Sequence, residues 1–199
     1  MKRLINILVL VTLTLVSTKS FSYNSNPKAF IDELMDDAIT TLSNKDISKA
    51  DKNKKIETIA LQNVDIEALG MYTLGQTRKS LDQANLKKYK NLFEKYFLKS
   101  LTSRLTDYSS SKFEVVSADK KSSNYTIISS KITPENGDPE IKIDWRIYTK
   151  NPEQPLIRDL IVEGLSLART QKEEFASILN SNNNDINILI SKLIEFANK

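Results

Sequence analysis

Cysteine and histidine are both absent from the 199-residue sequence. Without thiolates or imidazoles the chain cannot build thiolate or histidine zinc sites, nor a Ser-His or Cys-His nucleophile. It also has no disulfide and no cysteine that could carry a lipid anchor. An enzyme of this composition would have to work with carboxylates, Lys, Tyr or Arg alone. We therefore expect a protein that is not an enzyme and that needs no metal and no cofactor.

Long apolar runs are also scarce, and the one at the start is short. Residues 1–22 begin with two basic side chains and continue with an apolar run, Leu4 to Val16, of about a dozen residues. A membrane span needs roughly 18 to 20 apolar residues, so this run predicts a signal peptide cleaved after Ser22. A short N-terminal membrane anchor is the alternative. Residues 23–199 are then expected to form a single domain.

The chain lacks a strong charge of either sign once that segment is set aside. Of the 29 basic residues, Lys2, Arg3 and Lys19 lie in the expected signal peptide, which leaves 26 against 25 acidic residues. Nucleic-acid-binding domains carry a basic stripe and a clear basic excess. We therefore expect no nucleic-acid partner.

Apolar residues at three- and four-residue spacing predict helices in both halves of the chain. The N-terminal set covers 27–43, a second helix around Ile56 to Leu61, and a short third helix that Asp65 would cap and Gly75 would end. The longest helix is predicted over 82–108, and its stripe is unusually aromatic. Two further helices, over 168–180 and 185–197, close the chain.

Between these helices the apolar period changes to two, which predicts strands. Four stretches rich in β-branched and aromatic residues, KFEVVSA, NYTIISSKI, EIKIDWRIYT and PLIRDLIVEGLSL, are joined by short polar connections. The predicted fold class is α+β: N-terminal helices, a four-stranded twisted antiparallel sheet and C-terminal helices. A strongly twisted sheet wrapped around helices can enclose an apolar cavity, and we expect one here.

The sequence contains no complete catalytic motif. The stretch Gly164-Leu-Ser-Leu-Ala168 resembles a nucleophile turn, but it lacks the second Gly and no His is present to activate Ser166. Ser166 is better explained as a polar residue at a strand-to-helix corner. Asp144, Asp159 and Glu163 are expected to form ion pairs with neighbouring arginines, and a glycosidase-like carboxylate pair is the lesser alternative.

Several motifs, in order along the chain, identify a resemblance. They are Val64-Asp-Ile66 through Leu74-Gly75, the helix from Phe93 to Tyr108, Ile143-Asp-Trp-Arg-Ile147, and above all Asp159-Leu-Ile-Val-Glu-Gly-Leu-Ser-Leu167. Over about 28–197 the chain resembles the MlaC family, the periplasmic phospholipid carriers of the Mla pathway. It departs from the family at Ile66, where Phe is common, and at Asn182 to Asn184, where a Gly is usual.

The resemblance implies a soluble periplasmic carrier whose phospholipid ligand inserts its acyl chains between sheet and helices. It implies transfer between an outer-membrane lipoprotein complex and an inner-membrane MCE-type ABC transporter complex, which maintains outer-membrane lipid asymmetry. Two alternatives stay open: a periplasmic chaperone or interaction module with a filled core, and a small-molecule enzyme on a similar scaffold.

The expected site combines an apolar cavity lining with a cationic rim. The large aromatic side chains of the long helix readily line apolar pockets, although they equally suit a packed core. The predicted lining residues are Leu69, Tyr72, Leu74, Phe93, Phe97, Leu101, Ile127, Trp145, Ile147, Leu160, Val162 and Leu165. The predicted head-group or rim residues are Arg146, Arg158, Arg169 and Lys172.

Overall fold

The computed structural model describes residues 23–105, 111–135, 137–151 and 154–198. The expected signal peptide and Tyr108 lie outside the described residues. The elements in chain order are α1 (Pro27–Ser43), α2 (Lys49–Asn63), α3 (Ile66–Thr73), the 3-10 helix η1 (Gly75–Lys79), α4 (Gln83–Leu105), β1 (Ser111–Ser122), β2 (Tyr125–Pro134), β3 (Ile141–Asn151), β4 (Gln154–Val162), β5 (Leu165–Ser166), α5 (Leu167–Asn180) and α6 (Ile186–Asn198). The α+β class and the order of helices, sheet and helices are confirmed.

Local capping chemistry sets the helix starts. The Asn26 side chain accepts hydrogen bonds from the first backbone amides of α1, and Pro27 occupies the first helical turn, where its missing N–H costs nothing. Asp65 caps α3 by accepting from the Ala68 amide, as predicted. Gly75 follows α3 with φ 57°, the left-handed conformation in which glycine is the least strained residue.

The sheet is antiparallel throughout, with neighbouring strands in the order β1-β2-β3-β4-β5. The fourth predicted strand is divided into two strands in the structure, because the chain turns back at Glu163-Gly164. These two residues have φ 49° and 81°, which fits the two-residue turn favoured in tight hairpins. Leu165 and Ser166 then pair with Val162 and Ile161 as a fifth, two-residue strand. The structure thus adds one short strand to the expected four.

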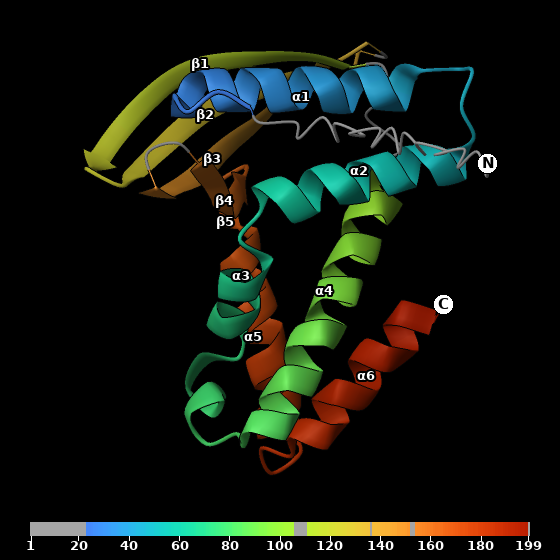
Figure 1. Ribbon diagram of the computed structural model, residues 1–199, viewed down its shortest axis with the longest axis vertical. Helices are drawn as coiled ribbons and strands as arrows, with labels where there is room; N and C mark the ends of the chain where they lie inside the picture. The colour runs from blue at the N-terminus through green and yellow to red at the C-terminus, as the bar shows by residue number, and fades with distance from the viewer. Residues whose placement is uncertain (1–22, 106–110, 136, 152–153, 199) are drawn as a thin grey trace, which may run out of the picture.

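The two faces of the sheet are chemically different. Ile128, Ile143, Trp145 and Ile147 are buried on the face that packs against α1, over which the strands curve (Figure 1). Register pairs such as Ser129 with Asp144 and Ile127 with Arg146 lie on the opposite face, which we call the open face. The strict alternation along β2 and β3 therefore separates an apolar face from a polar one.

Two apolar clusters make up the core, one at each end of the molecule (Figure 1). The sheet cluster joins α1 to the covered face of the sheet through Phe30, Ile31, Leu34, Ile128, Ile132, Ile143, Trp145, Ile147 and Ile157. The helical cluster joins α3, α4, α5 and α6 through Ile66, Leu74, Tyr89, Phe93, Phe175, Leu179, Ile186, Leu189, Ile190 and Leu193. Val64, between α2 and α3, packs against both clusters.

Candidate functional site

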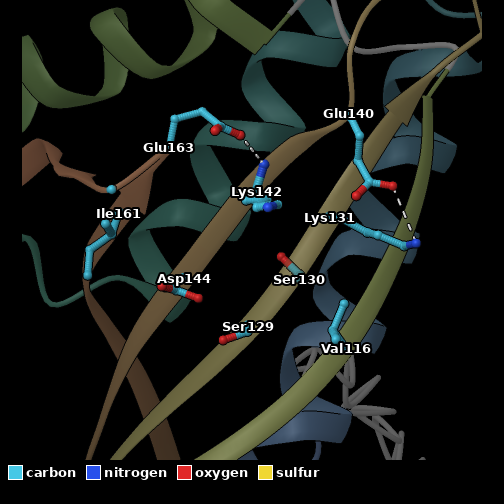
Figure 2. Close-up of a pocket in the computed structure, with 10 residues that line it drawn as sticks. Val116, Ser129, Ser130, Lys131, Glu140, Lys142, Asp144, Ile161 and Glu163 are labelled. Atoms are coloured by element: carbon cyan, nitrogen blue, oxygen red, sulfur yellow. Dashed lines mark hydrogen bonds and ion pairs between the residues drawn. The ribbon is translucent and has the colours of Figure 1, made fainter.

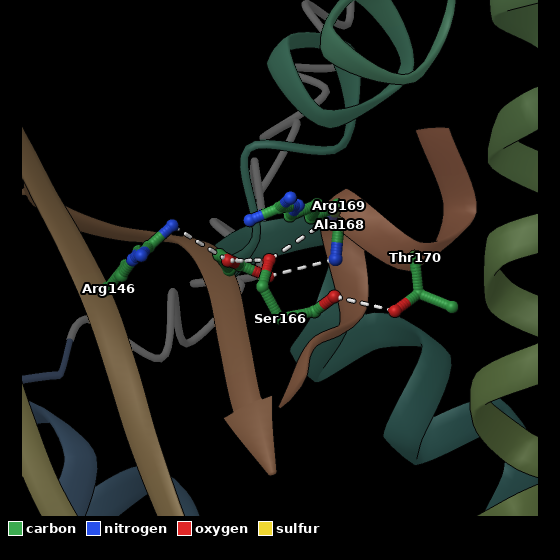
Figure 3. Close-up of polar contacts among 6 residues, drawn as sticks. Arg146, Ser166, Ala168, Arg169 and Thr170 are labelled. Carbon is green, nitrogen blue, oxygen red and sulfur yellow. Dashed lines mark hydrogen bonds and ion pairs between the residues drawn. The ribbon is translucent and has the colours of Figure 1, made fainter. Parts of the chain in front are cut away.

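The turn between β4 and α5 is organised by one buried carboxylate. Asp159, 5% exposed, accepts hydrogen bonds from Arg146 Nη1 at 3.1 Å, from Ser166 Oγ at 2.6 Å and from the Ala168 amide at 2.9 Å (Figure 3). Ser166 Oγ in turn accepts from the Arg169 amide and caps α5. Three donors satisfy a carboxylate that would otherwise be costly to bury. We call residues 159–169 the corner; its polar groups fix its shape.

A second ion pair ties the helices to the sheet. Arg158 Nε and Nη2 donate to the same oxygen of Asp65 at 2.9 and 2.8 Å, and the guanidinium carbon lies 3.6 Å from the centroid of the Tyr148 ring. The Asp65 amide also donates to the Ile157 carbonyl. Asp65 therefore holds the start of α3 and β4 together at the point where the two clusters meet.

One surface pocket lies on the open face of the sheet. It has a volume of about 480 Å³ and is lined by polar side chains, among them Ser129, Lys131, Lys142, Asp144 and Glu163 (Figure 2). Glu163 is held in place because its carboxylate accepts from the Lys142 amide. The pocket carries charges of both signs, and its lining also includes the apolar Val116 and Ile161. Because it lies on the open face of the sheet, it is not the apolar cavity between sheet and helices expected from the sequence.

The second pocket, of about 560 Å³, lies beside the corner. Its lining includes Tyr72, Arg146, Leu165, Arg169 and Glu173. Arg146 and Arg169 place two guanidinium groups at one pocket, each already in contact with a carboxylate. The two arginines and the aromatic Tyr72 distinguish this pocket from the first, which is lined by lysines and has no aromatic side chain among its described lining residues.

A hydroxyl pair lies inside the helical cluster. Tyr89 is fully buried; its hydroxyl donates to the Gly70 carbonyl at 3.1 Å and lies 2.8 Å from the Thr73 hydroxyl. Burial raises the pKa of Tyr89 well above its usual range, since the phenolate would lose its hydration. A Cβ at Gly70 would lie 2.8 Å from the Phe93 ring, which explains the glycine in this helix by close packing.

The predicted lining residues fall into three groups. Those that belong to the helical cluster or pack against it are Leu69, Leu74, Phe93 and Phe97. Those that belong to the sheet cluster or pack against it are Trp145, Ile147, Leu160 and Val162. The others are the half-buried Leu101, Ile127 on the open face, and the exposed Tyr72 and Leu165. The sequence prediction thus merged side chains from two distinct clusters and from the surface into one lining.

The predicted rim cations all have partners in the folded chain. Arg146 pairs with Asp159, Arg158 with Asp65, and Arg169 with Glu173 at 2.9 Å, while the Lys172 ammonium lies 5.0 Å from the centroid of the Tyr72 ring. The Arg169 pair raises the pKa of that guanidinium through its hydrogen bond and charge interaction with Glu173. Arg146, Arg169 and Lys172 lie around the second pocket or its Tyr72 wall, whereas Arg158 lies at the junction of α3 and β4.

The expected ion pair of Asp159 with a neighbouring arginine is confirmed, and the arginine is Arg146. Two other polar residues with a structural role, Thr73 and Ser130, had no prediction from the sequence. Ser130 accepts from the Trp145 indole at 2.8 Å and donates to the Ile143 carbonyl. The only available signal for Ser130 was its position on the apolar side of an alternating strand, where a polar residue needs a partner.

Further observations concern metals and membranes. Within the described ranges no group of three or more Asp or Glu residues could hold a metal ion. The same ranges contain no helix that is both long and apolar enough to cross a membrane.

Comparison with known proteins gives the class and then the family. The solved structure of a phospholipid-binding protein from Ralstonia solanacearum, in complex with a phospholipid, has the same fold, with a TM-score of 0.71. The two chains are 16% identical, and the match covers 85% of this chain and 96% of the other. A sequence model described as MlaC protein matches residues 32–195. The chain belongs to the MlaC family, as its motifs predicted.

Proposed function

We propose that this protein is a periplasmic phospholipid carrier. The observation that supports this most strongly is family membership over 32–195, together with a fold that extends along almost the whole length of a phospholipid-bound relative. The absence of His and Cys from the sequence supports binding rather than catalysis as the function. The expected signal peptide at residues 1–22 supports export.

The ligand's acyl chains are proposed to lie between the sheet cluster and the helical cluster. This boundary is supported by the predicted lining residues, since one group packs against each cluster and Val64 touches both. Side chains that are only partly buried, such as Phe97 and Leu160, can move at lower cost than the fully buried Ile147 or Leu189. Acyl chains enter by displacing such side chains from their neighbours.

The energetics of such a carrier favour exchange. Burial of a methylene contributes about 0.8 kcal/mol, so two long acyl chains gain on the order of 20 kcal/mol relative to water. Most of this gain is offset when the lipid comes from a bilayer, where its chains are already buried. A carrier therefore binds its lipid tightly relative to the lipid in water, but only weakly relative to the lipid in a membrane or in another carrier. Direction must come from its partners, for which the family resemblance suggests an outer-membrane lipoprotein complex and an inner-membrane MCE-type transporter.

Native mass spectrometry of protein purified from the periplasm tests this function. We expect a mass increment that denaturation releases as phospholipid. Phe97→Glu, which places a charge at the proposed boundary, should abolish the increment while the protein stays folded by circular dichroism. Leu61→Glu is the matched control, because Leu61 is 49% exposed on α2 and its variant should keep the lipid.

A lipid-free wild-type mass under gentle conditions would contradict the proposal. It would favour the other interpretation of the sequence, a chaperone or interaction module with a filled core. If Phe97→Glu unfolds the protein, Phe97→Ser on the same position gives the comparison with a smaller perturbation.

A further inference from the structure

The corner carries the most exposed large apolar side chain among the described residues. Leu165 is 68% exposed, and Leu167 and Tyr72 nearby are 41% and 42% exposed. No atom lies within 4 Å of where a Cβ of Gly164 would be, so the turn that precedes Leu165 projects away from the fold. Leu165 and Tyr72 line the same pocket, so these apolar groups are close together rather than scattered. Leucines on a projecting turn need an explanation, because folding leaves them in water.

Cationic groups surround this apolar tip. Arg146 and Arg169 line the pocket together with Leu165, and Lys172 lies over the Tyr72 ring. The side chains of Arg146 and Arg169 are 40% and 74% exposed. The Lys172 side chain also lies close to Gly75, the first residue of η1, and the last turn of η1 carries Arg78 and Lys79. The acidic groups here are Asp159 and Glu173, each paired with an arginine, and Glu163, whose carboxylate accepts from the Lys142 amide. The basic side chains of the rim and of η1 outnumber these three: Arg78, Lys79, Arg146, Arg169 and Lys172.

Arg146 also has unused hydrogen-bonding capacity. Its Nη1 donates to Asp159, whereas its Nε is shielded from solvent and has no partner among the described residues. The Arg146 side chain is nonetheless 40% exposed at the pocket, so its exposed guanidinium nitrogens can donate to an additional oxygen acceptor there. A phosphate oxygen is such an acceptor and also matches the positive charge of the rim.

We propose that this tip, formed by Tyr72, Leu165, Leu167 and the cations Arg146, Arg169 and Lys172, docks the protein on the surface of an anionic phospholipid bilayer. The proposal rests on the carrier function and adds the place where the carrier meets its membrane. Leucine and tyrosine side chains enter the head-group region while arginine and lysine contact lipid phosphates, the combination found in interfacial membrane binding. A protein partner is a poorer fit, since stable interfaces bury roughly 800 Å² on each side and this apolar tip has only three large side chains.

Docking here would also bring the lipid site close to the bilayer. The corner is continuous with β4, which contributes Leu160 and Val162 to the sheet cluster, and with α5, which contributes Phe175 to the helical cluster. A bilayer at the corner therefore lies at the end of the elements that border both clusters.

Vesicle flotation with the purified full-length mature protein tests the proposal. The vesicles contain phosphatidylcholine alone or phosphatidylcholine with phosphatidylglycerol. We expect binding to the anionic vesicles that weakens as salt rises, because the rim cations are screened. Arg169→Gln should weaken binding about fivefold, the effect of one cation near an anionic surface. Leu165→Ser should weaken it about tenfold by removing apolar contact with the bilayer.

Two variants elsewhere serve as matched controls. Lys28→Gln breaks an exposed ion pair with Asp32 at the same four-residue helical spacing as Arg169 and Glu173. Leu61→Ser removes an exposed leucine from α2. Both should bind vesicles like the wild type. Native mass spectrometry of all four variants reports the lipid cargo separately.

Each outcome either supports or overturns the docking proposal. Loss of vesicle binding in the two corner variants, with both controls unchanged, supports it, and the cargo measurement shows separately whether Leu165 and Arg169 also affect lipid loading. Absence of wild-type binding, equal binding to both vesicle types, or equal loss in the controls overturns it. Self-association that Leu165→Ser abolishes, without vesicle binding, would instead assign the tip to a contact between copies of the chain. Vesicle binding by a wild type that carries no lipid would overturn the carrier function but leave the docking surface standing.

Discussion

The sheet cluster and the helical cluster are both closely packed, but they are filled by different kinds of side chain. The sheet cluster is built mainly from isoleucines and has two edge-on aromatic pairs, Phe113 with Trp145 and Tyr23 with Phe30. The helical cluster is centred on aromatic rings, with Phe93 in contact with Tyr89, Tyr96, Phe97 and Phe175. A buried hydroxyl forms hydrogen bonds beside each cluster, Ser130 at the sheet cluster and Thr73 at the helical cluster.

This difference follows from the geometry of the elements. Branched aliphatic residues fit the closely spaced positions of a covered sheet, whereas rings fill the wider space between crossing helices. Offset and edge-to-face rings in the helical cluster leave several members partly buried, including Tyr96 and Phe97.

The largest expected effects come from truncating the centre of each cluster. Trp145→Ala and Phe93→Ala should each reduce the free energy of unfolding by about 3–5 kcal/mol, the range for removal of a buried aromatic side chain. Urea titration followed by circular dichroism should give one transition in both variants, because Val64 and the Asp65–Arg158 pair connect the clusters. Two separate transitions would mean that the clusters unfold independently.

Removal of the corner carboxylate should have the next largest effect. Asp159→Ala leaves Arg146, Ser166 and the Ala168 amide without their shared acceptor, and we expect a loss of about 3 kcal/mol in unfolding free energy. Thermal unfolding measures it. Glu173→Ala is the control, since its exposed pair with Arg169 should contribute well under 1 kcal/mol. Equal losses in both variants would show that the corner is not organised by Asp159.

A smaller effect is expected inside the helical cluster. Tyr89→Phe removes the hydroxyl that meets Thr73 and Gly70 but keeps the ring, so the unfolding free energy should fall by about 1–2 kcal/mol. Tyr72→Phe, which changes a partly exposed tyrosine, should be close to neutral by the same urea titration. A neutral Tyr89→Phe would mean that the buried hydroxyl pair contributes nothing to stability.

Most of the fold could be predicted from periodicity and capping. The helix over 27–43 was predicted with the bounds that the structure gives, because Asn26, Pro27 and the apolar spacing all act locally. The fifth strand was not predicted, since a two-residue strand carries no period and depends on pairing with β4. A glycine inside a helical pattern, such as Gly70, indicates close packing, but the identity of its neighbour, Phe93, required the folded chain.

The site was harder to predict than the fold. Apolar periodicity identifies which side chains are buried but not which cluster they join, so Trp145 and Phe93 could not be separated from sequence alone. The rim arginines were identified by charge, whereas their partners depend on tertiary contacts: Asp65 lies 93 residues from Arg158. The exposure of Leu165 also became evident only once the turn at Glu163 and Gly164 was seen.

The central claim is that acyl chains lie between the two clusters. Methyl NMR of the protein loaded with a phospholipid that carries a nitroxide near the end of one acyl chain tests it most directly. We predict strong paramagnetic broadening of methyl groups from both clusters, such as Ile143 and Leu193, with Leu61 on the surface of α2 unaffected. Broadening restricted to surface methyl groups, or to one cluster alone, would contradict the claim.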